Sequence, residues 1–202
     1  KYDEWKDDPD MIGDVMRFLD NVLSDFINKA PEQFKDAKYS AERERSVGLG
    51  VMGFHSFLQQ KRIPLESVMA KSWNKKIFKN IHEKVNQASK DLAEERGACP
   101  DAAEYGFKER FSNKTAIAPT ASISIICGGA SPGVEPIAAN SYTHKTLSGS
   151  FNVRNRYLEE ILESHGKNDD ETWSTITTNQ GSVSHLDFLT ELEKDVFKTA
   201  FE

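Results

Sequence analysis

Apolar side chains recur at helical spacing along much of the first hundred residues. Over residues 11–27, Met, Ile, Val, Leu and Phe alternate with charged residues in steps of three and four, the pattern of an amphipathic helix. Asp8 and Pro9 precede this run as an N-cap and a first-turn proline, and Pro31 ends it. The charged stretch 37–45 is also predicted to be helical. The pattern therefore predicts a helix-rich start with one core-facing helix.

The longest periodic segment follows Pro64 and ends at Gly97, which is predicted as the residue after the helix. A helix of about 30 residues would be roughly 45 Å long at ~1.5 Å per residue. Its apolar stripe advances mostly in steps of four and comprises Leu65, Met69, Trp73, Ile77, Ile81, Val85, Ala88 and Leu92. Shorter helices are predicted at residues 99–104, 157–164 and 171–178. A capping box, Thr190-Glu-Leu-Glu193, predicts another that continues through Phe201.

Strand-like stretches are few and short. Thr115–Ala118 has the length and bulk of a buried strand, Pro119 ends it, and a second strand-like patch lies at Phe151–Val153. After Pro119 come small residues and then an isoleucine-rich turn of helix that ends before Gly128. This order directs unpaired backbone N–H groups and the positive end of a helix dipole to one place, where an anion could bind.

Two interpretations of this turn stand side by side. Thr120, Ser122 and Ser124 could hydrogen-bond phosphate oxygens, or a Ser or Thr could cap its own helix. The residues alone favour the cap, because most helices have one. Glu135, in an apolar, proline-bracketed turn, has two equally supported roles: an ordinary capping acid, or a brace for the loop upstream.

A glycine pattern, Gly48-x-Gly50-x-x-Gly53, resembles a dinucleotide-binding fingerprint. That fingerprint follows a buried strand, whereas the residues before Gly48 are the charged Glu42–Arg45. We therefore expect these glycines to let the chain pass close to neighbouring backbone.

Composition narrows the class of protein. The 202 residues are 29% charged and 38% apolar with a net charge of −6, so a nucleic-acid partner is not expected. No run reaches the ~18–20 apolar residues of a membrane span. Cys99 and Cys127 share no metal or redox spacing, which suits a reducing compartment, so we expect a cytoplasmic protein without a membrane partner or a metal site. The chain lacks a first methionine and its last apolar face is uncapped, so residues 1–202 are expected to be a single fragment of a longer protein.

Six segments together resemble the large (alpha, catalytic) subunit of ribonucleotide reductase, with class I enzymes the best fit. The resemblance spans nearly the whole chain. It rests on Arg43–His55, Glu95–Ala103, Ala116–Ser124, Gly133–Pro136, Tyr142–Phe151 and Glu193–Glu202.

The resemblance implies an α/β, helix-rich fold: part of the second half of a ten-stranded α/β barrel, with few short strands and Thr115–Ala118 as one barrel strand. It also implies that one loop binds the diphosphate of a ribonucleoside diphosphate. The implied substrate-binding residues are Thr120, Ala121, Ser122, Ile123 and Ser124, supported by Pro119 and Glu135. The implied partners are the rest of the alpha subunit and a radical-generating beta subunit that contains a metal, with adenosylcobalamin as the less favoured radical source.

The family's chemistry needs residues that this chain lacks. Neither Cys99, in Ala-Cys-Pro, nor Cys127, in Ile-Cys-Gly, matches the Asn-x-Cys-x-Glu context of the family's radical cysteine. The paired tyrosines that carry the radical, the redox cysteine pair and the regulatory nucleotide-binding region are also absent. We therefore assign no catalytic residue and expect no turnover by these residues alone. The alternatives are a non-catalytic helical module that docks through 65–92 or 196–201, and one half of a split reductase subunit.

Overall fold

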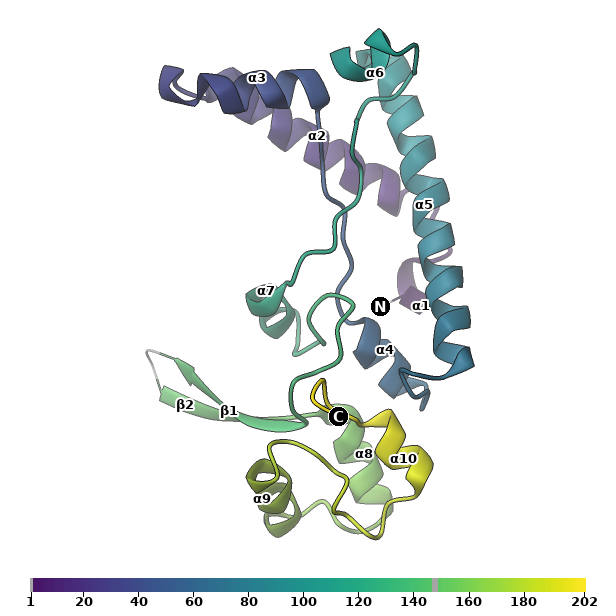
Figure 1. Cartoon of the computed structure of the whole chain (residues 1–202), viewed down its shortest axis with the longest axis vertical. Helices are drawn as coiled ribbons and strands as arrows, with labels where there is room; N and C mark the ends of the chain where they lie inside the picture. The colour runs from purple at the N-terminus through teal and green to yellow at the C-terminus, as the bar shows by residue number, and fades with distance from the viewer. Residues whose placement is uncertain (1, 147–148) are drawn as a thin grey trace. The chain divides into compact units, whose positions relative to one another are not determined.

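The computed structural model describes residues 2–146 and 149–202, and its contacts divide the chain into two compact units (Figure 1). Unit 1 comprises Lys1–Gly50 and Asn74–Ala118, and unit 2 comprises Val51–Trp73 and Pro119–Glu202. The fold is helix-rich with few strands. Among the described residues, no helix combines the length and the hydropathy that a membrane crossing requires.

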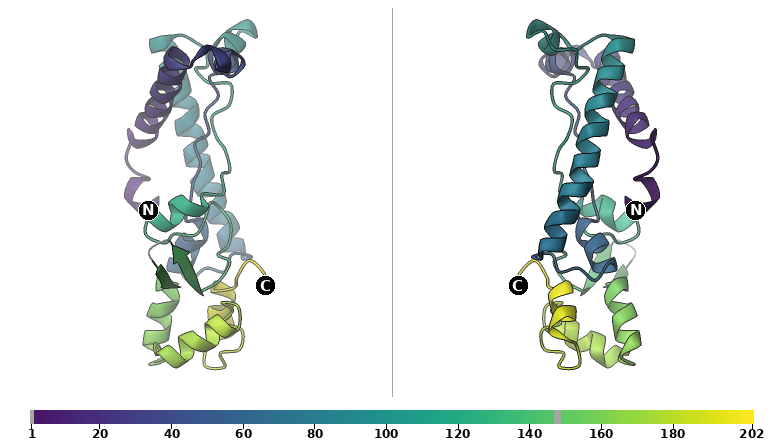
Figure 2. Two further views of the ribbon diagram at one scale, coloured as in Figure 1. Left: turned by 90° about the vertical axis from the view of Figure 1, so that its left-hand side faces the viewer. Right: turned by 90° about the vertical axis from the view of Figure 1, so that its right-hand side faces the viewer.

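Unit 1 is built from helices and two extended segments. The helices are α1 (Tyr2–Trp5), α2 (Met11–Lys29), the short 3-10 turn η1 (Glu32–Phe34), α3 (Lys35–Glu44), α6 (Pro100–Glu104) and, from Asn74 onward, α5 (Val68–Arg96). Helix α5, with 29 residues, is the longest element of the chain, as the two views in Figure 2 also show. The predicted long helix and its end at Gly97 (φ +88°) are confirmed.

Both long helices begin later than the sequence predicts. Helix α2 has Asp10, not Asp8, at its N-cap position. The Asp8 carboxylate still accepts hydrogen bonds from the amides of Asp10 (2.9 Å) and Met11 (3.1 Å), so it supplies the capping oxygen from two residues further out. Helix α5 begins at Val68, because the Ser67 hydroxyl accepts the Ala70 amide (3.1 Å).

The stripe on α5 is buried over only part of its predicted length. Since the helix begins at Val68, Leu65 lies outside it, and the Met69 side chain is 57% exposed. The buried members of the stripe lie in unit 1 and are Ile77, Ile81, Val85, Ala88 and Leu92. The alternative prediction, a module that docks on a partner through this stripe, is therefore wrong for these five residues, because the chain itself covers them.

The strand predicted at Thr115–Ala118 does not form. An isolated parallel bridge joins Leu49 to Thr115, supported by hydrogen bonds from the Leu49 amide to the Lys114 carbonyl (3.0 Å) and from the Ala116 amide to the Leu49 carbonyl (3.1 Å). The segment is exposed, and the Ile117 side chain is 80% exposed. A buried strand needs neighbours on both edges, and among the described residues this segment has one, so the predicted burial is wrong here.

The glycines at 48 and 50 act as the sequence predicts. A Cβ added at Gly48 would lie 2.8 Å from the Ala116 Cβ, and one added at Gly50 would lie 2.8 Å from the Ala116 carbonyl oxygen. Helix α3, and not a strand, precedes these glycines, so they do not form a dinucleotide fingerprint. Their role is to permit the close pairing of the two extended segments.

Unit 2 contains one hairpin and several short helices. They are α4 (Phe54–Gln60), α7 (Ala121–Ile126), β1 (Ser141–Thr146), β2 (Gly149–Arg154), α8 (Arg156–Ser164), α9 (Asp170–Thr178) and α10 (Glu191–Val196). Strands β1 and β2 pair antiparallel from Ser141↔Arg154 to Thr146↔Gly149. The sequence predicted only the middle of β2 and missed β1, whose composition is polar.

The core of unit 2 gathers α8, α9 and α10. Its buried members are Leu158, Leu162, Trp173, Ile176, Val183, Leu186, Leu189, Val196 and Phe197. The predicted capping box of α10 is confirmed. The helix nevertheless ends at Val196, because the Ala200 amide donates to the Ile137 carbonyl (2.9 Å) instead of continuing the helix, and Phe201 is 83% exposed. Val196 and Phe197 are buried in this core, so these two residues are not available to the docking face predicted at residues 196–201.

Candidate functional site

Thr120 begins the candidate loop in an unusual conformation. It precedes α7 with φ 51° and ψ 30°, in the left-handed region, and its hydroxyl makes no capping bond to the helix. Instead, Oγ1 accepts a hydrogen bond from the Gly133 amide (2.7 Å). An ordinary N-cap residue is extended and bonds the amide of the second or third helical residue. The plain-cap interpretation of this turn is therefore wrong.

The amides of Ala121, Ser122 and Ile123 belong to the first turn of α7. Among residues 2–146 and 149–202, no backbone or side-chain oxygen accepts a hydrogen bond from them. All three residues are exposed, and the first intrahelical bond of α7 runs from the Ser124 amide to the Thr120 carbonyl (2.9 Å). Unpaired N–H groups at the positive end of a helix dipole favour an anion, by about 0.3–1 kcal/mol from the dipole alone.

Ser124 faces the interior. Its side chain is 2% exposed, its hydroxyl donates to the Ala121 carbonyl (3.2 Å), and its own carbonyl accepts the Ala130 amide (3.1 Å). Pro119, just before the loop, is exposed. The structure thus brings Ala121–Ile123 and the Ser122 hydroxyl to the surface, while Ser124 holds the turn together from beneath.

The turn Ser131–Ile137 is hydrogen-bonded to the start of α4. The Ser56 amide donates to the Ser131 hydroxyl (3.0 Å), and the Ser131 amide donates to the Ser56 hydroxyl (2.8 Å). The Gly53 amide donates to the Ser131 carbonyl (2.8 Å), and the Ile137 amide donates to His55 Nδ1 (3.1 Å). These bonds fix both ends of the turn to one helix.

Glu135 lies at the outside of this turn. Its amide donates to the Pro132 carbonyl (3.1 Å), its side chain is exposed, and within the described chain its carboxylate has no hydrogen bond or ion pair. The contact from the turn to the loop is made by the Gly133 backbone. His55, Ser56 and Ser131 were not predicted as site residues, although they lie within or beside two of the segments that carry the family resemblance.

His55 is neutral at physiological pH. Its side chain is 1% exposed, and this burial lowers its pKa from 6.5 to about 4, although the ring also hydrogen-bonds the Val196 carbonyl. Because Nδ1 accepts the Ile137 amide, Nε2 carries the ring proton. The side chain therefore serves as a fixed acceptor for the turn.

Other reactive groups are sparse. Cys99 is buried and Cys127 is exposed, and both are free thiols. In the part of the chain that the structure describes, no three His, Cys, Asp or Glu side chains are grouped as metal ligands.

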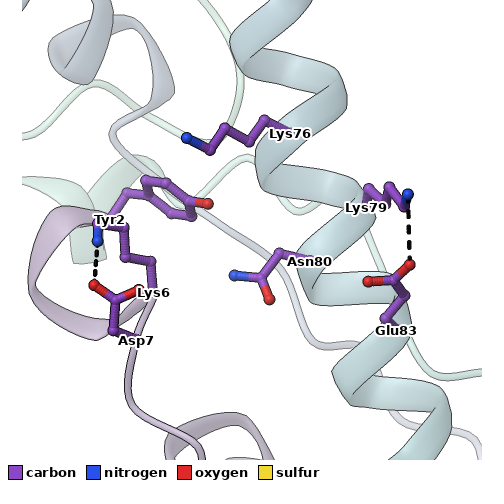
Figure 3. A pocket seen from close by; sticks show the side chains of 7 residues that line it. All are labelled: Tyr2, Lys6, Asp7, Lys76, Lys79, Asn80 and Glu83. Carbon is purple, nitrogen blue, oxygen red and sulfur yellow. Dashed lines mark hydrogen bonds and ion pairs between the residues drawn. The ribbon is translucent and has the colours of Figure 1, made fainter.

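Unit 1 contains a hollow of about 330 Å³. Figure 3 shows the side chains that line it, which are Tyr2, Lys6, Asp7, Lys76, Lys79, Asn80 and Glu83. Two of its lysines have carboxylate neighbours, because Lys6 pairs with Asp7 and Lys79 pairs with Glu83. Their positive charge is therefore largely compensated.

Comparison with known proteins assigns the chain to a family. A family model described as "Ribonucleotide reductase, barrel domain" matches residues 2–109 and 101–202. The chain is 50% identical to the ribonucleoside-diphosphate reductase large subunit of Invertebrate iridescent virus 6, covering 100% of this chain and 21% of the relative. It is 45% identical to the corresponding subunit of Invertebrate iridescent virus 3, over 98% of this chain and 32% of the relative.

A solved structure agrees with these sequence matches. The class Id ribonucleotide reductase alpha subunit of Actinobacillus ureae superposes with a TM-score of 0.88 at 40% identity, over 98% of this chain and 36% of that one. The chain therefore spans roughly a fifth to a third of these relatives. The chain belongs to the ribonucleotide reductase family and corresponds to part of the barrel domain of its large subunit.

Proposed function

We propose that this chain supplies the substrate-diphosphate loop of a ribonucleotide reductase catalytic subunit, which converts ribonucleoside diphosphates to deoxyribonucleoside diphosphates. The loop is Thr120–Ser124, preceded by Pro119, and the support that the sequence assigned to Glu135 comes instead from the Gly133 amide, which bonds the Thr120 hydroxyl. One observation carries the proposal: the Ala121–Ile123 amides are exposed and unpaired in the described chain, while the Thr120 hydroxyl that would ordinarily cap them bonds Gly133.

The proposed binding mode uses backbone donors first. The three amides donate to non-bridging oxygens of the diphosphate, and the exposed Ser122 hydroxyl adds a further donor. Hydrogen bonds to a charged acceptor contribute about 1.5–3 kcal/mol each, before the cost of immobilising the ligand. Because base and ribose contacts would come from other parts of the large subunit, we expect binding to this chain to be weak, about millimolar.

The radical and redox chemistry would come from outside these residues. A radical-generating, metal-containing partner subunit, with adenosylcobalamin as the less favoured source, would supply the oxidising radical. Cys99 is buried, and Cys127 lies alone at the exposed end of α7. We expect the 202-residue chain alone to form no deoxynucleotide with any reductant, and product from the purified chain would contradict this. Both cysteines are free thiols, which agrees with the cytoplasmic setting that we propose.

The loop is tested by titrating the ¹⁵N-labelled chain with CDP, ADP and inorganic pyrophosphate and following the amide signals. We expect the Ala121, Ser122 and Ile123 amides to shift most, and CDP and pyrophosphate to shift them similarly. The double substitution Ser122→Ala/Ser124→Ala should weaken binding, and Ser122→Ala alone should account for most of the loss, since the Ser124 hydroxyl is buried.

Ser174→Ala is the matched control. Ser174 is an exposed serine on α9 in the same unit, and its substitution should leave binding unchanged. Saturable diphosphate binding that is identical in wild type and in the double variant, or shifts that avoid residues 121–123, would remove this loop from the proposal.

A further inference from the structure

The conformation of Thr120 needs a stabilising partner. Among the described residues four non-glycine positions have positive φ, and of Arg45, Arg62, Thr120 and Gln180 only the threonine is β-branched. A left-handed backbone is unfavourable for L-residues, and more so for a β-branched one, because the side chain is crowded against its own backbone. A contact that holds the side chain in place must offset this cost.

The Gly133 amide provides that contact. Its hydrogen bond to Thr120 Oγ1, at 2.7 Å, lies within the ordinary range for N–H···O and is partly shielded from water. Gly133 is buried, so if Thr120 turned away its amide would lose a partner inside the protein. Both groups therefore favour the left-handed state of Thr120.

The position of Gly133 is set in turn by α4. The reciprocal Ser56–Ser131 pair fixes the start of the turn, and His55 fixes its end at Ile137. Ser56 and Ser131 are 7% and 0% exposed, so water competes little for these bonds. The Phe54 amide also reaches the Gly133 carbonyl (3.4 Å).

We propose that the turn Ser131–Ile137, anchored on α4 by Ser56 and His55, is the positioning element of the loop. Its Gly133 amide keeps the Thr120 hydroxyl from capping α7 and so leaves the Ala121–Ile123 amides free for a diphosphate. Without this brace, Thr120 relaxes to the extended conformation usual for an N-cap, and its hydroxyl takes up one of the donors that the ligand needs. The inference rests on the proposed diphosphate function for its purpose, while the brace itself is a property of this chain alone.

The test is the double substitution Ser56→Ala/Ser131→Ala, which removes both hydroxyls of the reciprocal pair without touching the loop. We expect hydrogen exchange at the Gly133 amide to accelerate at least about tenfold. The affinity for inorganic pyrophosphate should fall about tenfold, which corresponds to about 1.4 kcal/mol. Ser141→Ala is the control: its hydroxyl is also buried and bonds the Thr177 hydroxyl (2.8 Å) in the same unit, and neither quantity should change.

A second pair of variants covers the case in which the double substitution unfolds unit 2. Thr120→Ser keeps the acceptor and should retain both Gly133 protection and pyrophosphate binding. Thr120→Val keeps the shape but lacks the acceptor, so it should lose both. A merely structural role for the hydroxyl would lower stability without moving the amide signals of residues 121–123.

The outcomes separate the two proposals. A folded Ser56→Ala/Ser131→Ala chain with native Gly133 protection and native pyrophosphate affinity overturns the brace and leaves the loop function standing. If pyrophosphate does not shift the amide signals of residues 121–123 in the wild-type chain, the loop function is overturned. The brace is then judged by hydrogen exchange at the Gly133 amide. Loss of protection in Thr120→Val, but not in Thr120→Ser, supports the brace in either case.

Discussion

The two units solve the problem of buried polar groups in different ways. In unit 1 the Asp20 carboxylate, 0% exposed, is surrounded by three arginines from distant parts of the chain. Arg45 lies at 2.7 Å, Arg96 at 2.8 Å and Arg110 at 2.9 Å from its oxygens. The cluster ties α2 to the end of α3, to the end of α5 and to the segment after α6, and it carries a formal excess of positive charge.

Unit 2 uses neutral amides in the corresponding role. The Asn140 side chain donates to the carbonyls of Phe197 (2.7 Å) and Gly181 (3.0 Å). The Asn155 side chain donates to Asn140 Oδ1 (2.8 Å) and to Gln59 Oε1 (3.0 Å). Beside this network lies the apolar core of α8–α10. A buried charge without a partner costs more free energy than a buried neutral amide without one. The two units should therefore respond differently to substitution and to pH.

The largest expected effect is Asp20→Ala in unit 1. Removing this carboxylate leaves the buried Arg45 and Arg110 without a carboxylate partner in the described chain, while Arg96 keeps one carboxylate contact, with Glu95 (3.3 Å). We therefore expect the free energy of unfolding of unit 1 to fall by about 3–5 kcal/mol. Hydrogen exchange of the amides in α2 and in the second half of α5 measures the loss. The control is Arg17→Ala, which breaks an exposed pair with Glu95 (2.7 Å) and should lower stability far less than the Asp20 substitution does. Equal losses in the two variants would contradict a special role for the cluster.

The next largest expected effect is the loss of stability that a cavity in the core of unit 2 would cause. Leu162 is 0% exposed in the α8–α10 core, and Leu162→Ala should lower the free energy of unfolding of that unit by about 3 kcal/mol, because the lost side chain leaves a void. Urea unfolding followed by Trp173 fluorescence measures it. Leu192→Ala, at a 58% exposed position on α10, should change stability by less than about 0.5 kcal/mol. A comparably small effect at position 162 would show that the core is loosely packed.

A pH titration distinguishes the units without mutation. Burial lowers the pKa of His55 from 6.5 to about 4, so the folded state favours the neutral ring. Its contribution is fully present above pH 6.5 and is lost as the pH falls from 6.5 toward 4. The loss at pH 5 is about 2 kcal/mol. The pKa of Asp20 is also lowered, despite burial, by its hydrogen bonds to Arg110, Arg96 and Arg45, so its contribution is lost only below its ordinary pKa of 3.8.

Between pH 7 and pH 5, therefore, unit 2 should weaken and unit 1 should not. Amide exchange in α8 and α9, compared with exchange in α2, measures the difference after correction for intrinsic rates. His55→Gln, which does not titrate in this range, should abolish the pH dependence in unit 2. Equal weakening of both units would contradict the assignment to His55.

How much the sequence could predict also differs between local and long-range features. Helices at 11–27 and 65–97 follow from apolar spacing, and the capping box at Thr190 follows from four adjacent residues, so these predictions hold within a few positions. Polar β1 gave no signal, because its pairing with β2 decides its conformation. The loop at Thr120 could be located from its small residues, but its left-handed backbone depends on Gly133, thirteen positions away. Likewise, the Asp20 cluster joins residues up to 90 positions apart, which periodicity cannot reveal.

The smallest expected effect is the loss of stability when the N-terminal cap of one helix in each unit is removed. In unit 2 the Thr190 hydroxyl accepts the Glu193 amide (3.3 Å), while Glu193 Oε2 accepts the Thr190 amide (2.8 Å), so Thr190→Ala removes one half of a reciprocal box. In unit 1 a single carboxylate, Asp8, accepts the amides of the N-cap residue Asp10 and of Met11, the first residue of α2, so Asp8→Ala removes the whole side-chain cap. Each substitution should cost about 1 kcal/mol. The Asp8 variant should cost slightly more, because a carboxylate at a helix N-terminus also interacts favourably with the dipole. Urea unfolding in 0.1 M and 1 M salt checks this, since salt should reduce the cost of Asp8→Ala and leave that of Thr190→Ala unchanged. A salt effect of equal size on both costs would show that charge does not distinguish the two caps.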